Sequence, residues 1–90
     1  MDVDEIASFI EALLFTSEIA LTELELSEKI GCTETEVESS LKRLKRHHQR
    51  RSMGSLIVSR VGRGWILEVD PNWSNRLDTS VQSQISSRLI

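Results

Sequence analysis

The sequence predicts an α+β, mainly helical fold of the winged-helix type. Its parts are a three-helix helix-turn-helix core with a short strand, a two-stranded wing and a C-terminal helical segment. Three observations lead to this prediction: apolar residues recur at helical spacing in the first half of the chain, a helix-capping motif occurs twice in succession, and two extended runs joined by glycines follow. We expect residues 1–71 to form the winged-helix domain and residues 72–90 to form a helical extension that packs on it or is loosely ordered.

The first helix is expected between Val3 and Phe15. Its apolar residues fall on one side of a helix that turns about 100° per residue. They are Ile6, Phe9, Ile10, Leu13 and Leu14. Phe15 projects roughly opposite this stripe. We expect it to pack under the following connection, and the alternative is that it contacts a partner molecule.

The second helix follows a short extended segment at Ile19–Thr22. Thr22 is expected to cap the helix, and Glu25, three residues later, completes a capping box. Gly31 is expected to end the helix because glycine readily adopts a positive φ. The apolar contacts of this helix are expected from Leu24, Leu26 and Ile30.

The third helix begins with the same motif. Thr33 and Glu36 form a second capping box, and the helix is expected over about residues 34–50. Cys32, just before the cap, is interpreted as a packing residue because no catalytic partner is near it in the sequence. Two capped helices joined through Gly31 and Cys32 indicate a helix-turn-helix, which is the most specific local signal in the chain.

The wing is expected from two runs, "SLIVSRV" and "WILEVD", that are rich in branched and aromatic residues. The sequence "GRG" at residues 62–64 joins them as a hairpin turn that requires glycine geometry. Asp70 and Pro71 suit the cap and the first position of a last helix. Its apolar residues come every four positions and drift around the helix, so a break is expected near residues 78–80. They are Trp73, Leu77, Val81, Ile85 and Leu89.

The composition excludes several classes of protein. A chain of 90 residues, 39% hydrophobic and 28% charged, is expected to form one small domain. No segment reaches the roughly 20 apolar residues of a membrane helix, and the acidic start lacks the basic region of a secretory signal, so a cytoplasmic location is expected. One cysteine and two histidines offer neither an internal disulfide nor a zinc-type spacing. The sequence contains no catalytic or phosphate-binding motif, so we expect no enzyme activity, no cofactor and no metal.

The charge is divided unevenly along the chain, with −10 on residues 1–40 and +7 on residues 41–90. In the third helix, Glu34, Glu36 and Glu38 precede the run "LKRLKRHHQRR" at residues 41–51. Acids at the N-terminal end oppose entry into a phosphate-lined groove, so base reading by this helix is disfavoured. The same charges complement the helix dipole, which makes a solvated face the simplest interpretation.

Two further interpretations of the positive charge remain open: contact with DNA phosphates without sequence preference, and contact with an acidic protein partner. The candidate residues are Lys42, Arg43, Lys45, Arg46, Arg50, Arg51, Arg60 and Arg63. His47 and His48 are expected to cap the helix end or face water rather than bind metal. His48 lies nearest the apolar stripe, so we expect it at the buried edge of the helix. Large apolar residues are candidates for a dimer or partner interface, with core packing as the alternative for the tryptophans. They are Phe9, Leu13, Phe15, Trp65 and Trp73.

Four features carry a resemblance to a known family. They are "IEALLFTSE" at residues 10–18, "LTELELSEKIG" at residues 21–31, the spacing of Val37, Leu41 and Leu44, and "GSLIVSRVGRGWILEVDP" at residues 54–71. Together they span most of residues 6–77 and resemble the amino-terminal winged-helix domain of the segregation and condensation protein B (ScpB-like) family. Members of that family usually carry two winged-helix domains in tandem, whereas this sequence contains one.

The resemblance implies a non-enzymatic accessory subunit of a condensin-like complex that acts in chromosome partition, chromosome condensation and cell division. It also implies a homodimer that binds a kleisin and a condensin-type ATPase at the nucleoid, in the cytoplasm. The alternative is a small winged-helix DNA-binding transcriptional regulator. A regulator would bind a specific operator, whereas the subunit that the resemblance implies would bind DNA weakly or without sequence preference.

Overall fold

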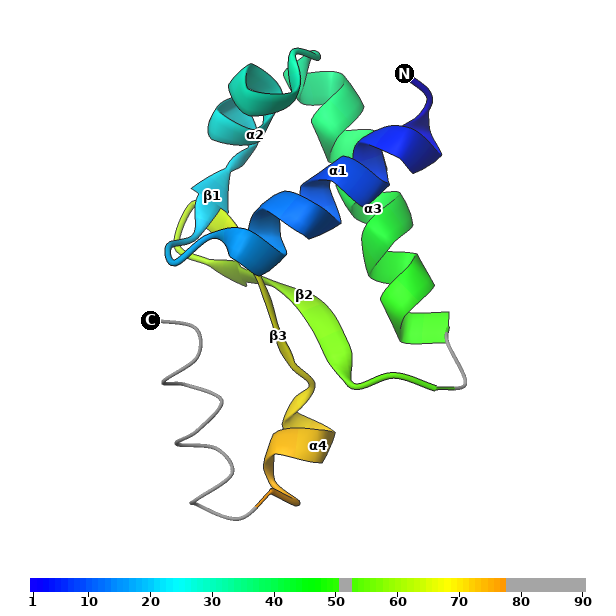
Figure 1. Cartoon of the computed structure of the whole chain (residues 1–90), viewed down its shortest axis with the longest axis vertical. Helices are drawn as coiled ribbons and strands as arrows, with labels where there is room; N and C mark the ends of the chain where they lie inside the picture. The colour runs from blue at the N-terminus through cyan, green and yellow to red at the C-terminus, as the bar shows by residue number, and fades with distance from the viewer. Residues whose placement is uncertain (51–52, 78–90) are drawn as a thin grey trace.

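The computed structural model describes residues 1–50 and 53–77, and it confirms the winged-helix fold (Figure 1). The elements follow in the order α1 (Val3–Thr16), β1 (Leu21–Thr22), α2 (Glu23–Ile30), α3 (Glu34–Arg50), β2 (Leu56–Val61), β3 (Gly64–Val69) and α4 (Pro71–Ser74). The helix-turn-helix is thus α2 and α3, and the wing is the β2–β3 hairpin. The bounds of α3 are those that the sequence predicts.

Local capping fixes where the helices begin and end. At the start of α2, the Thr22 N–H donates to Glu25 Oε1 at 3.0 Å and the Glu25 N–H donates to Thr22 Oγ1 at 3.1 Å. The same reciprocal pair joins Thr33 and Glu36 at the start of α3, with both distances 3.1 Å. Gly31 ends α2 with a φ of 84°, in the left-handed region that favours glycine. Both predicted capping boxes are confirmed.

The three strands form an antiparallel sheet in the order β1-β3-β2. A two-residue connection, Gly62 and Arg63, joins β2 to β3, and Gly62 has a φ of 60°. Gly64 lies in β3 rather than in the turn, where it pairs with Val61 and Thr22. A Cβ at Gly64 would lie 2.8 Å from the Cβ of Ala20, so glycine is required there by the close approach of the chain that enters β1.

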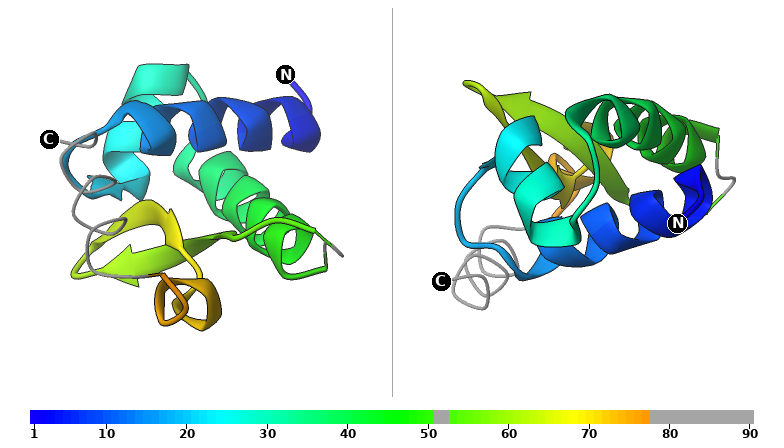
Figure 2. Two further views of the ribbon diagram at one scale, coloured as in Figure 1. Left: turned by 60° about the horizontal axis from the view of Figure 1, so that its bottom comes forward. Right: turned by 90° about the horizontal axis from the view of Figure 1, so that it is seen from above.

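The core lies where α1 and the hairpin both pack against α3, as Figure 2 shows. Its buried members are Ile6, Ala7, Ile10, Leu14, Leu21, Leu26, Val37, Leu41, Leu44, Val58 and Trp65. Three of them, Val37, Leu41 and Leu44, form the apolar stripe predicted for the third helix. Leu13, Ile30, Cys32 and Leu67 are half-buried against this cluster.

Two predictions of burial, those for Phe15 and Leu24, are wrong. Phe15 is 62% exposed rather than packed under the next connection, because it projects away from the buried side of α1. Leu24 is 54% exposed, since it lies two residues from the buried Leu26 and so about 200° away around α2. Phe9, at the edge of the stripe, is 41% exposed.

The last helix begins as predicted but is shorter than predicted. Asp70 accepts a hydrogen bond from the Asn72 N–H at 2.9 Å, and Pro71 occupies the first turn of α4. The helix then ends at Ser74, and none of the residues Pro71–Ser74 is buried. The break predicted near residues 78–80, and Val81, Ile85 and Leu89, lie outside the described residues.

Candidate functional site

The C-terminal half of α3 presents a positively charged surface with two shallow hollows. One, of about 450 Å³, is lined by Arg43, Arg46, His47 and Arg50. The other, of about 410 Å³, is lined by Lys42, Lys45, Arg46 and Gln49. Arg46 belongs to both hollows, so they form one continuous surface. The described residues that line them include no carboxylate.

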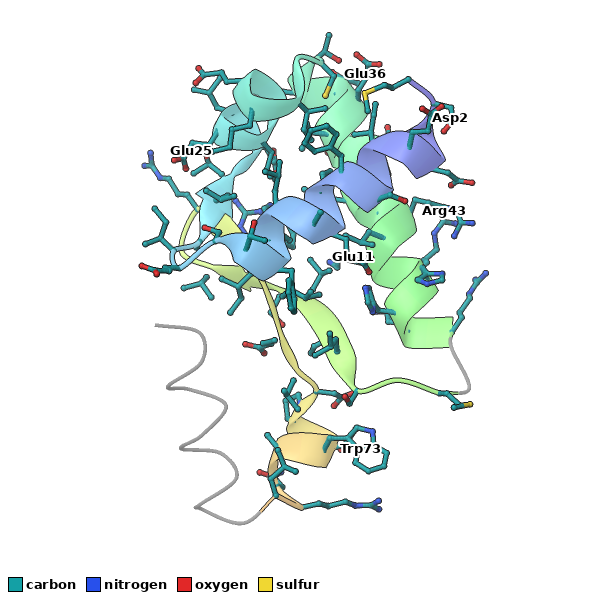
Figure 3. All side chains as sticks on the ribbon, viewed as in Figure 1. Asp2, Glu11, Glu25, Glu36, Arg43 and Trp73 are labelled. Atoms are coloured by element: carbon teal, nitrogen blue, oxygen red, sulfur yellow. The ribbon has the colours of Figure 1, made fainter. Side chains whose placement is uncertain are left out.

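One ion pair and one hydrogen bond between side chains connect this half of α3 to α1. Arg43 Nε lies 3.1 Å from Asp4 Oδ1, and His48 Nε2 lies 2.7 Å from Glu11 Oε2, with Glu11 pointing toward α3 (Figure 3). Within residues 1–50 and 53–77, no lysine or arginine of α3 other than Arg43 forms an ion pair. Arg43 is therefore partly neutralised by a neighbour, whereas Arg46 is not.

His48 is buried, as the spacing of apolar residues in the third helix predicts. Its partner was not predicted from the sequence. Its side chain is 2% exposed and its ring is bound to Glu11, 37 residues earlier. The first helix contains one signal for this contact: Asp4 and Glu11 are seven residues apart, so both acids lie on the same face of α1. His47 is exposed and lines the first hollow.

Trp65 links the positive surface of α3 to the wing. Lys45 Nζ lies 5.1 Å and Arg60 Cζ lies 5.3 Å from the centre of the Trp65 ring, within the range of cation–π attraction. The Trp65 Nε1–H donates to Glu23 Oε1 at 3.3 Å. Lys45 comes from α3 and Arg60 from β2, so the indole brings charges from two elements to one place.

The remaining candidate cations lie apart from this cluster or outside the described residues. Arg63 is exposed at the hairpin turn. Arg51 lies outside the described residues. The acids at the other end of α3, Glu34, Glu36 and Glu38, are exposed. The charge along α3 therefore reverses from its N-terminal to its C-terminal half, as the sequence predicts.

An apolar hollow of about 350 Å³ lies between the end of α1 and the wing. Two of the residues that line it, Phe15 and Ile19, are 62% and 68% exposed. The other residues that line it are Leu14, Ser17, Glu18, Leu56, Ile66, Leu67, Glu68 and Val69. Of the candidate interface residues only Phe15 belongs to it. Ile19, Leu56 and Ile66 were not candidates, because each comes from a short segment with no helical stripe to single it out.

The other candidate interface residues are dispersed. Trp65 is buried in the core, and Leu13 is half-buried against it. Phe9 is exposed on α1. Trp73 projects from α4, is 46% exposed and has Arg76 Cζ 5.2 Å from the centre of its ring (Figure 3). The five residues therefore do not form one surface.

Neither a reactive thiol nor a metal cluster is seen in the described part of the chain. Burial raises the pKa of the Cys32 thiol, which keeps it protonated and less reactive. No group of three or more histidine, cysteine or acidic side chains in residues 1–50 and 53–77 could hold a metal ion. No helix among these residues is both long and apolar enough to cross a bilayer.

Comparison with known proteins identifies related folds and a family. The family model described as "Segregation and condensation complex subunit ScpB" matches residues 8–90. The crystal structure of ScpB from Mycobacterium tuberculosis is similar at a TM-score of 0.79 and 16% identity, covering 94% of this chain and 52% of that one. A conserved hypothetical protein from Chlorobium tepidum is similar at a TM-score of 0.73 and 18% identity, covering 96% of this chain and 54% of that one. The chain thus spans about half the length of these two structures, and no curated protein matches it.

Proposed function

The chain belongs to the family of the segregation and condensation complex subunit ScpB, and we propose that it is a non-enzymatic accessory subunit that binds a kleisin and associates with itself. Family membership implies a condensin-associated segregation subunit. The observation that carries the proposal is the match of the family model over residues 8–90, because it includes both the helix-turn-helix and the wing.

Self-association is supported by the apolar hollow. Phe15 and Ile19 expose large apolar side chains beside a recess, and apolar recesses rimmed by polar residues are typical of protein interfaces. A second copy of the chain could cover the hollow and remove Phe15 and Ile19 from water. The proposed homodimer therefore places the end of α1 and the wing in its interface.

DNA contact is proposed as a secondary property of the positive surface on α3. The lysines and arginines of α3 that do not pair with Asp4 attract phosphates. The exposed acids at the start of α3 disfavour insertion of that end into the major groove. Contact without sequence preference fits this arrangement better than operator recognition. The transcriptional regulator is accordingly the weaker proposal.

A cellular experiment tests the proposed function. Disrupting the gene for this chain is expected to produce cells without nucleoids, and expression of the chain from a second locus should restore normal segregation. A fluorescent fusion is expected to lie over the nucleoid in the cytoplasm. Normal nucleoid counts in the disrupted strain would contradict the proposal.

A further inference from the structure

We propose that the positive surface of α3 and the wing together form one phosphate-binding site for duplex DNA, in which Trp65 is a positioning residue. The site consists of Lys42, Lys45 and Arg46 on α3 and Arg60 on β2. The inference rests on the proposed DNA contact and deepens it by assigning the residues and the manner of binding.

The three cations that α3 contributes to the site line one hollow. Lys42, Lys45 and Arg46 line it together with Gln49, and its lining among the described residues includes no acid. Lys42 and Arg46 are one turn apart, about 6 Å along the helix axis. Three positive charges in so small a space attract anions strongly.

The positive surface extends from α3 to the wing. Lys45 lines the hollow and also lies 5.1 Å from the centre of the Trp65 ring, and Arg60 lies 5.3 Å from the same centre. Trp65 is 9% exposed, so its ring is held by the core and offers a fixed surface to both cations. The Arg60 Nε–H also donates to the Gly62 carbonyl oxygen at 3.2 Å, which further restricts the guanidinium.

Glu23 sets a limit to the site. Its carboxylate accepts from the Trp65 Nε1–H, so one negative charge lies at the edge of the indole while the cations lie near its ring. On the other side, Arg43 is bound to Asp4 and contributes less positive potential than Arg46. The positive surface is therefore bounded by acids of α1 and α2.

The chemistry of the lining favours duplex DNA over an acidic protein. Protein interfaces depend on apolar anchors in pockets, and the described residues that line the hollow of α3 are two lysines, an arginine and a glutamine. Interfaces with nucleic acid are more polar and more positive. Contacts to phosphates position a protein without reading sequence. The acids at the start of α3 agree with phosphate contact that does not read sequence, because their negative charge opposes entry of the helix into the major groove.

Fluorescence anisotropy of a labelled random-sequence duplex tests the inference, with the salt concentration varied between about 50 and 200 mM. For the wild-type chain, the logarithm of affinity should fall linearly with the logarithm of salt. Arg46→Gln and Arg60→Gln should each weaken binding and reduce the magnitude of this slope by about 0.9, the value for one phosphate contact. Lys29→Gln, which removes the same charge from the last turn of α2, should leave the slope unchanged.

A spectroscopic measurement tests the position of Trp65. In a Trp73→Phe background Trp65 is the sole tryptophan, because the chain has two. Its emission should change on addition of duplex with the midpoint found by anisotropy. In the same background, Arg60→Gln should shift both midpoints together.

The possible outcomes distinguish a failure of this inference from a failure of the proposed DNA contact. No salt-dependent binding by the wild-type chain would overturn the proposed DNA contact and this inference with it. Binding that is weakened by Arg46→Gln but not by Arg60→Gln, with Trp65 emission unchanged, would overturn the inference and leave the DNA contact in place. Binding to polyglutamate but not to duplex would assign the surface to an acidic protein and overturn both.

Discussion

Glu25 and Glu36 show how single residues connect sequence to stability. Each carboxylate accepts a backbone N–H at the start of its helix, from Thr22 and Thr33 respectively (Figure 3). These hydrogen bonds lower the pKa of Glu25 and of Glu36 below the ordinary value of 4.5. Both capping boxes are predictable from sequence because all their groups lie within three residues.

The lowered pKa values predict a loss of stability in acid. The folded state binds these two protons less readily than the unfolded state, so the stabilisation is present above pH 4.5 and is lost as the pH falls through the lower folded values. Urea unfolding measured by circular dichroism across this range should show a shallower decline for the Glu25→Gln/Glu36→Gln double variant. If the free energy of unfolding of the double variant fell as steeply in acid as that of the wild type, Glu25 and Glu36 would not be the source of the acid sensitivity.

Gly64 provides a second prediction for a single residue. In Gly64→Ala, the new Cβ would lie 2.8 Å from the Ala20 Cβ and 3.0 Å from the Ala20 carbonyl carbon. Because backbone atoms cannot move aside cheaply, we expect a loss of about 1–3 kcal/mol in the free energy of unfolding.

Gly62→Ala is the comparison, since a Cβ there meets nothing within 4 Å and only the φ of 60° opposes it. That backbone cost is about 1–2 kcal/mol. Chemical denaturation of both variants gives the two values. An unchanged free energy of unfolding for Gly64→Ala would show that β1 does not approach β3 as closely as described.

At the scale of elements, the packing of α1 on α3 depends on a buried pair as well as on the apolar stripe. Glu11→Ala removes the acceptor of His48 Nε2, and His48 Nδ1 is already buried without a hydrogen-bond partner among the described residues. A buried nitrogen left without its partner costs about 1–3 kcal/mol. Thermal and urea unfolding should both report a loss of this size.

Asp4→Ala is the matched control for this prediction, because it removes the ion pair of Asp4 with Arg43 between the same two helices. That pair is half-exposed or more, with side-chain exposures of 48% for Arg43 and 73% for Asp4, so its loss should cost only about 0–1 kcal/mol. Equal losses for Glu11→Ala and Asp4→Ala would contradict the role given to burial.

The contrast between local and distant contacts explains what the sequence predicts. The bounds of α3, the two caps and the presence of the hairpin depend on neighbours in the chain and are predicted correctly, although Gly64 belongs to β3 and not to the turn. The contacts of Trp65 with Glu23 and of His48 with Glu11 join residues 42 and 37 positions apart, and the pattern within one element does not identify the partner in the other. The positive surface was therefore predicted as a set of charges, but its hollows, its ion pair with Asp4 and its link to the wing were not.

The shortness of α4 has a similar origin. Asp70 and Pro71 encode its start locally, whereas its length depends on packing that the spacing of apolar residues does not supply. Phe15 is the opposite case: its position opposite the stripe was recognised, but whether other chain segments cover it is a tertiary property. Its exposure places it on a surface.

At the scale of the whole molecule, the proposed homodimer depends on that exposed surface. Phe15→Glu would place a charge in the apolar hollow and should convert a dimer to a monomer while leaving the fold intact, because Phe15 is 62% exposed. Sedimentation equilibrium measures the mass. Leu24→Glu is the control, since Leu24 is 54% exposed on α2 and should leave the mass unchanged. A dimer that tolerates Phe15→Glu would exclude this hollow as its interface.

The proposed function makes the chain a kleisin-binding subunit of a condensin-like complex. Size-exclusion chromatography of the purified protein mixed with the kleisin of its own organism tests this most directly, with circular dichroism to establish that each component is folded. The two proteins are expected to elute together, earlier than either one alone. Separate elution of two folded proteins at their individual positions would contradict it.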